Sequence, residues 1–124
     1  MTTDNYYSNQ ARLFKVLAHP IRLAILALLR EEDQCVCHIE AFLGYRQAYI
    51  SQQLMVLRDA GLIEYSRSGL NIFYRIKDRS ILPIIDSANE YFGTSNQTWP
   101  QTKNKYCSCP KCYSNSDEQY VQMY

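Results

Sequence analysis

The feature that most constrains the fold of this chain is a set of three glycine-marked boundaries between residues 44 and 69. Gly44 follows a short apolar segment, Gly61 follows a longer segment with helical spacing, and Gly69 separates two alternating segments. Glycine readily adopts the left-handed conformation that ends helices and closes hairpins. The pattern therefore predicts two helices joined by a tight turn and followed by a two-stranded wing.

The segments on either side of this unit also have apolar residues at helical spacing. A first helix ends before His19-Pro20, because a residue that precedes proline is pushed out of the helical region. Pro20 suits the first position of a second helix, which ends at the acidic residues 31–33. We predict a mostly α fold with a β-hairpin wing, a winged helix-turn-helix of the α+β class. The expected helices span residues 11–17, 20–30, 38–43, 47–60 and 79–92, and the expected strands span residues 62–67 and 70–76.

A change in composition at Gly93 divides the chain, whose 124 residues have room for one domain and a tail. We expect a winged helix-turn-helix domain over residues 6–92 and a polar, cysteine-containing tail over residues 93–124. The tail alone has too few aliphatic residues to offset the entropy cost of ordering. The first and last helices of the domain lack an evident partner, so we expect them to form a homodimer interface.

The N-terminal residues and the lengths of the apolar segments indicate the cellular compartment of the protein. The N-terminal residues show no signal-peptide pattern, and no apolar run is long enough to span a bilayer. We therefore expect a cytoplasmic protein with no membrane partner. Its formal net charge of +1 permits nucleic-acid binding without predicting it.

The helix expected at residues 47–60 is the candidate for reading DNA. Ile50, Leu54 and Leu57 share its core face, so the opposite face is free to enter a major groove. Amide and hydroxyl side chains there can pair with base edges, and arginines on the wing can meet phosphates. A solvated helix face is the alternative interpretation. The candidate contacts to double-stranded DNA are Arg46, Gln47, Ala48, Tyr49, Ser51, Gln52, Arg67 and Arg75.

The five cysteines form two groups, and a reducing cytosol favours metal binding or reactivity over stable disulfides. Within a regular helix, Cys35 and Cys37 would point about 200° apart, so they converge only if Cys35 is extended at the helix start. The tail adds Cys107, Cys109 and Cys112, of which the last two have a common zinc-ligand spacing. These thiols predict a site for a soft ion such as arsenite, cadmium, lead or zinc. His38 is a possible further ligand.

Other roles for the cysteines remain open. They include two separate sites, a structural zinc in the tail alone, reversible disulfide sensing, and unrelated buried thiols. A Cys-His nucleophile lacks a third, orienting group, and the domain is too small for a substrate cleft, so we expect no catalytic residues and no enzyme.

Three segments resemble the ArsR/SmtB family of metal-responsive winged-helix repressors over roughly residues 10–92. They are LFKVLAHPIRLAILALL, CVCHIEAFLG and ISQQLMVLRDAGLIEYSRSGLNIFYRI. The resemblance implies a dimeric repressor that binds an operator near its own operon and releases it when a metal or metalloid ion binds. His38 stands where arsenic and cadmium/lead sensors usually have aspartate. Asp86 and Glu90 lack the histidines of the second, zinc-sensing site of the family. A rival function is a zinc-stabilised adaptor that binds a protein partner.

Overall fold

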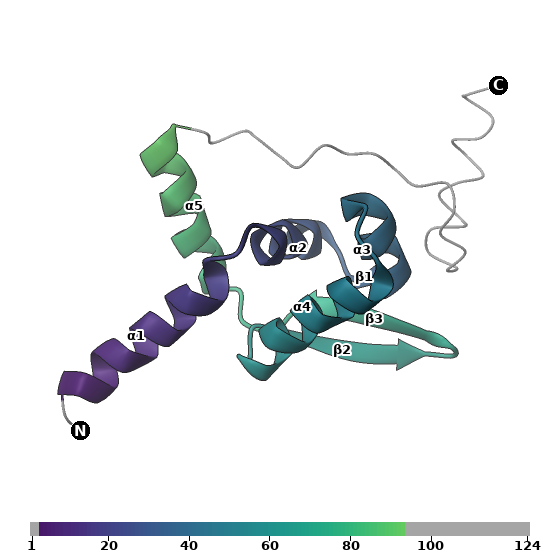
Figure 1. Ribbon diagram of the computed structural model, residues 1–124, viewed down its shortest axis with the longest axis horizontal. Helices are drawn as coiled ribbons and strands as arrows, with labels where there is room; N and C mark the ends of the chain where they lie inside the picture. The colour runs from purple at the N-terminus through teal and green to yellow at the C-terminus, as the bar shows by residue number, and fades with distance from the viewer. Residues whose placement is uncertain (1–2, 94–124) are drawn as a thin grey trace.

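The computed structural model describes residues 3–93, which contain five helices and one three-stranded antiparallel sheet (Figure 1). Figure 1 shows α1 and α5 on one side of the α2–α4 unit, while the hairpin of β2 and β3 extends from the other. The predicted winged helix-turn-helix fold is confirmed. In chain order the elements are α1 (Thr3–Leu17), α2 (Pro20–Glu31), β1 (Gln34–Cys35), α3 (Val36–Leu43), α4 (Gln47–Asp59), β2 (Ile63–Ser68), β3 (Asn71–Ile76) and α5 (Ile81–Phe92).

The helix boundaries follow the local signals in the sequence. His19 precedes α2 in an extended conformation, and its Nδ1 accepts a hydrogen bond from the Ile21 amide at 3.2 Å. His19 therefore caps the start of α2. Gly44 ends α3 with a φ of 77°, and its amide donates to the Glu40 carbonyl at 2.9 Å. The tight turn between α3 and α4 thus depends on a residue without a Cβ.

Three expectations about the elements were wrong in detail. The first helix begins at Thr3 rather than residue 11, and the third begins at Val36 rather than residue 38. The sheet has a third strand, β1, where only a two-stranded wing was expected. Its two residues pair with β3, with Gln34 opposite Tyr74 and Cys35 opposite Phe73. Two residues have no detectable periodicity, so only their distant partners reveal this strand.

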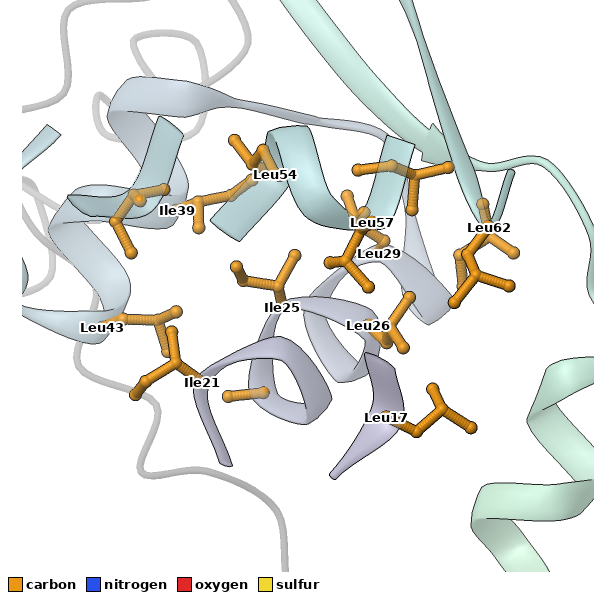
Figure 2. Close-up of a cluster of buried hydrophobic side chains, with 14 of the residues drawn as sticks. Leu17, Ile21, Ile25, Leu26, Leu29, Ile39, Leu43, Leu54, Leu57 and Leu62 are labelled. Atoms are coloured by element: carbon orange, nitrogen blue, oxygen red, sulfur yellow. The ribbon is translucent and has the colours of Figure 1, made fainter. Parts of the chain in front are cut away.

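The core lies between α2, α3, α4 and the base of the sheet (Figure 2). Ile50, Leu54 and Leu57 are fully buried, which confirms the inward face predicted for α4. Removing apolar surface from water supplies most of the driving force for folding. The largest fully buried side chains are Ile25, Leu26, Leu29, Ile39, Ile50, Leu54, Leu57 and Ile63.

The terminal helix α5 is held against this core mainly at its start. Ile81 is the buried residue of α5, and an ion pair joins Asp86 to Arg30 of α2 at 2.7 Å. Just before the helix, the Ser80 hydroxyl and amide donate to Asp78 and hold the pKa of that carboxyl below its usual value. Among residues 3–93, no helix has the length and apolar character needed to cross a membrane.

Candidate functional site

Cys35 and Cys37 come together at the junction of β1 and α3. Cys35 is the last residue of β1 and the N-cap of α3, with φ and ψ of −82° and 159°. This extended backbone turns its side chain toward Cys37, and the two sulfurs lie 2.8 Å apart. The Cys35 sulfur also accepts a hydrogen bond from the His38 amide at 3.3 Å. Cys35 is therefore extended at the start of the helix, as was required for the two thiols to converge.

The surroundings of the thiol pair link it to the sheet. Cys35 is buried, with 4% of its surface exposed, and packs with Cys37 against Phe73 of β3. Phe73 is also the residue opposite Cys35 in the β1–β3 ladder. Cys37 lies on α3, which packs against α4. The pair thus contacts β3 of the wing and belongs in part to α3, the helix that packs on α4.

Two thiols are a suitable donor set for a soft ion. In a tetrahedral zinc site, sulfurs about 2.3 Å from the metal lie about 3.8 Å from each other, so two adjacent thiols are placed to share one ion. Within residues 3–93, no three His, Cys, Asp or Glu residues gather as a complete ligand set. The predicted ligands Cys107, Cys109 and Cys112 lie outside the described residues. The His38 ring packs at 5.3 Å from the Phe42 ring, and its role as a ligand stays a prediction.

The candidate DNA contacts on α4 form one exposed face. Gln47, Ala48 and Gln52 are exposed, while Tyr49 and Ser51 are partly exposed beside them. Arg46 precedes the helix at its N-cap position and is also exposed. Tyr45, which was not among the predicted contacts, is 42% exposed, and its ring packs at 5.2 Å from that of Tyr49 in a tilted arrangement. The four-residue spacing across a helix start was the available signal for this aromatic pair.

The predicted arginines of the wing differ in their surroundings. Arg67 is exposed in β2, close to the hairpin turn. Arg75 pairs with Glu64 on the neighbouring strand, with Nε 2.8 Å from the carboxylate oxygen. Glu64 therefore offsets part of the positive charge that Arg75 would present to a phosphate.

One polar residue on the inner face of α4 was also missed. Gln53 is only 6% exposed, although it lies between the outward-facing Gln52 and the core residue Leu54. Its side-chain oxygen accepts a hydrogen bond from Arg22 of α2 at 2.9 Å. A buried amide needs such a partner, and the partner is 31 positions away, so helical spacing alone does not reveal it.

Comparison with known proteins identifies relatives of this chain. The model of the bacterial regulatory proteins of the arsR family matches residues 19–65. A biofilm growth-associated repressor of Xylella fastidiosa is 34% identical over 87 residues, which cover 70% of this chain and 76% of that protein. The HTH-type transcriptional repressor SmtB of Mycobacterium tuberculosis is 36% identical over 81 residues, covering 65% of this chain and 60% of the repressor.

A solved structure shares the fold. The homodimeric winged helix-turn-helix DNA-binding domain of a possible ArsR-family regulator from Mycobacterium bovis superposes with a TM-score of 0.67. The match has 26% sequence identity and covers 78% of this chain and 91% of that one. These relatives are transcriptional regulators, which is the class expected for this chain, and not enzymes.

Proposed function

The chain is a transcriptional regulator that belongs to the arsR family of bacterial regulatory proteins, and we propose that it represses transcription from operator DNA until a soft ion binds its thiolates. The repressor acts in the cytoplasm as a homodimer on double-stranded DNA. Arsenite, cadmium, lead and zinc are the candidate inducers, because thiolate sites select soft ions. The single observation that carries the proposal is the 2.8 Å contact between the Cys35 and Cys37 sulfurs beside strand β3 of the wing.

DNA binding is supported by the arrangement of the exposed polar residues. The outward face of α4 presents amides and hydroxyls of a size that fits a major groove, with Arg46 at its start. Arg67 near the hairpin turn extends the surface toward a neighbouring groove or phosphate. Exposed aromatic side chains on α1 and α5 support dimerisation, and the similar domain from Mycobacterium bovis is homodimeric.

The position of the thiol pair suggests how ion binding causes release of DNA, because the pair is linked to the wing through β3 and to α4 through α3. An ion held by both thiolates would fix the separation and orientation of Cys35 and Cys37. Cys35 is held to β3 by backbone pairing and packs against Phe73, so its displacement is transmitted to the wing. Cys37 moves with α3, which packs on α4. A coupling free energy of about 1 to 3 kcal/mol would lower operator affinity about 5- to 150-fold.

The complete ligand set of the inducer is a further part of the proposal. Cys35 and Cys37 supply two thiolates, whereas a trigonal site needs three and a tetrahedral site needs four. The tail cysteines Cys107, Cys109 and Cys112 are the proposed source of the others. They come from the same subunit or from its partner.

The test compares DNA release by wild-type protein and by the variants Cys35→Ser and Cys37→Ser. A duplex enriched by the wild type from a random-sequence library serves as the probe, and its fluorescence anisotropy is followed while each ion is added in turn. Both variants are expected to bind the duplex within about threefold of wild type but to lose the ion-induced release. Normal release by either variant with all four ions would overturn the assignment of the thiol pair.

Two controls separate this proposal from its rivals. Variants Cys107→Ser, Cys109→Ser and Cys112→Ser show which tail thiols contribute, through loss of sulfur-to-metal charge-transfer absorbance. Release by peroxide in metal-free buffer, with no release by ions, would instead indicate a redox sensor in which Cys35 and Cys37 are oxidised. Absence of any enriched duplex would favour the zinc-stabilised adaptor.

A further inference from the structure

A single guanidinium group connects the first helix of the protein to its reading helix. Arg22 lies in α2, and its Nε donates to the Gln53 side-chain oxygen in α4 at 2.9 Å. One of its terminal nitrogens donates to the Val16 carbonyl in α1 at 3.1 Å. We refer to Arg22, the Val16 carbonyl and Gln53 as the Arg22 bridge. It joins three helices through two hydrogen bonds.

Both acceptors of the Arg22 bridge need a donor from outside their own helices. Val16 lies in the last turn of α1, where carbonyls have no partner within the helix. Gln53 is 6% exposed, so water cannot readily replace Arg22 at its side-chain oxygen. A planar guanidinium has donors that point in different directions, whereas lysine has one compact ammonium group. Arginine is therefore suited to hold both acceptors at once.

The position of Gln53 makes this bridge relevant to DNA binding. Gln52, the next residue along α4, is exposed on the predicted DNA face. Because adjacent helical residues are about 100° apart, anchoring Gln53 toward α2 limits the rotation of α4 about its axis. The same anchor limits the movement of α4 relative to α1, whose Tyr6, Tyr7 and Phe14 are exposed.

We propose that Arg22 is a positioning residue that sets the spacing and orientation of the two reading helices in the operator-bound dimer. The inference rests on the proposed function, in which α1 contributes to the dimer interface and α4 enters the major groove. Half-sites recognised by a dimer are separated by a fixed number of helical turns of DNA. A loose link between α1 and α4 allows each reading helix to bind its half-site but weakens the requirement for one spacing.

The experiment measures spacer preference rather than affinity alone, because a merely structural role would lower binding to all duplexes equally. A duplex enriched by the wild type is compared with duplexes that have one or two base pairs inserted or deleted between the half-sites. Wild type is expected to lose at least about tenfold in affinity at each altered spacing. Gln53→Leu, which removes the acceptor, is expected to discriminate between spacings by less than about threefold.

Three further variants serve as comparisons. Gln53→Glu still accepts from Arg22 and is expected to keep the wild-type spacer preference. Arg22→Lys keeps the positive charge but loses the planar group whose donors point in different directions. It is expected to show a spacer preference between those of the wild type and Gln53→Leu. It also takes the place of Gln53→Leu in the test if that variant does not fold. Arg79→Met is the matched control, because Arg79 donates to the Arg30 carbonyl at the end of α2, at 3.2 Å, rather than to a side chain of α4.

Sedimentation and thermal unfolding establish that each variant is folded and dimeric before its spacer preference is measured. A wild-type spacer preference in folded, dimeric Gln53→Leu, or in folded, dimeric Arg22→Lys if Gln53→Leu does not fold, would overturn the role of the Arg22 bridge. Failure of the wild type to enrich any duplex would overturn the proposed function instead. The two failures are thus distinguished by which protein fails to select DNA.

Discussion

The closed core around α2 and α4 and the outer faces of α1 and α5 differ in where their apolar side chains lie. In the core, Leu26 and Leu54 are completely shielded from water by side chains of the same chain (Figure 2). On the terminal helices, Phe14, Tyr91 and Phe92 are 53%, 84% and 73% exposed. The difference indicates that one chain is sufficient to complete the core, and it supports the proposal that the terminal helices bury their aromatic residues against a second subunit.

The largest effect that tests this comparison is expected from Leu26→Ala. Leu26 is fully buried in α2, and its truncation leaves a cavity that should lower the free energy of unfolding by about 2 to 5 kcal/mol. Leu23→Ala is the matched control in the same helix, because Leu23 is 37% exposed, and it should cost about 1 kcal/mol or less. Urea unfolding at one protein concentration measures both. Equal losses for the two variants would contradict the distinction between core and surface.

A smaller effect, on self-association rather than folding, is expected from Phe92→Ser at the end of α5. Loss of this exposed ring should weaken the dimer by at least about tenfold, as for an aromatic residue at an interface. Leu70→Ser is the control, because Leu70 is fully exposed in the hairpin turn, away from both terminal helices. Sedimentation at micromolar concentration gives the association constants. A monomeric wild type would contradict the proposed dimer interface, since the aromatic residues of α1 and α5 would then be exposed in solution.

The smallest effect is expected from Asp86→Asn, which removes the ion pair between α5 and α2. Arg30 and Asp86 are 35% and 49% exposed, so water screens their attraction. The variant should lose no more than about 1 kcal/mol of stability, and less at high salt. Thermal unfolding at two salt concentrations provides the measurement. A loss as large as that of Leu26→Ala would show that the terminal helix depends on polar contacts with the core.

Local signals predicted most of the fold. Pro20, Gly44 and Gly61 act on the residues next to them, so the positions of α2, α3 and α4 follow from short segments of sequence. The inward face of α4 was also predictable, because helical spacing alone assigns Ile50, Leu54 and Leu57 to one side. The start of α1 was predicted eight residues late, since its first turns carry polar residues that give no apolar period.

Contacts between distant segments were not predictable from the sequence. The strand β1 consists of Gln34 and Cys35, and its existence depends on β3, about 40 positions later. The hydrogen bond from Arg22 to Gln53 joins residues 31 positions apart. Neither pair leaves a periodic pattern, because each contact is produced by the packing of whole elements.

The amino-acid sequence was sufficient to predict that this chain forms a winged helix-turn-helix and that two cysteines lie near the start of its third helix. These properties depend on turn residues, helical spacing and the order of side chains along the chain. The three-dimensional structure was needed to show that the Cys35 and Cys37 sulfurs meet at 2.8 Å beside β3, and that Arg22 donates a hydrogen bond to Gln53 of α4. The physical reason is that β1 becomes extended when it pairs with β3, and that a buried amide takes its partner from whichever helix packs against it.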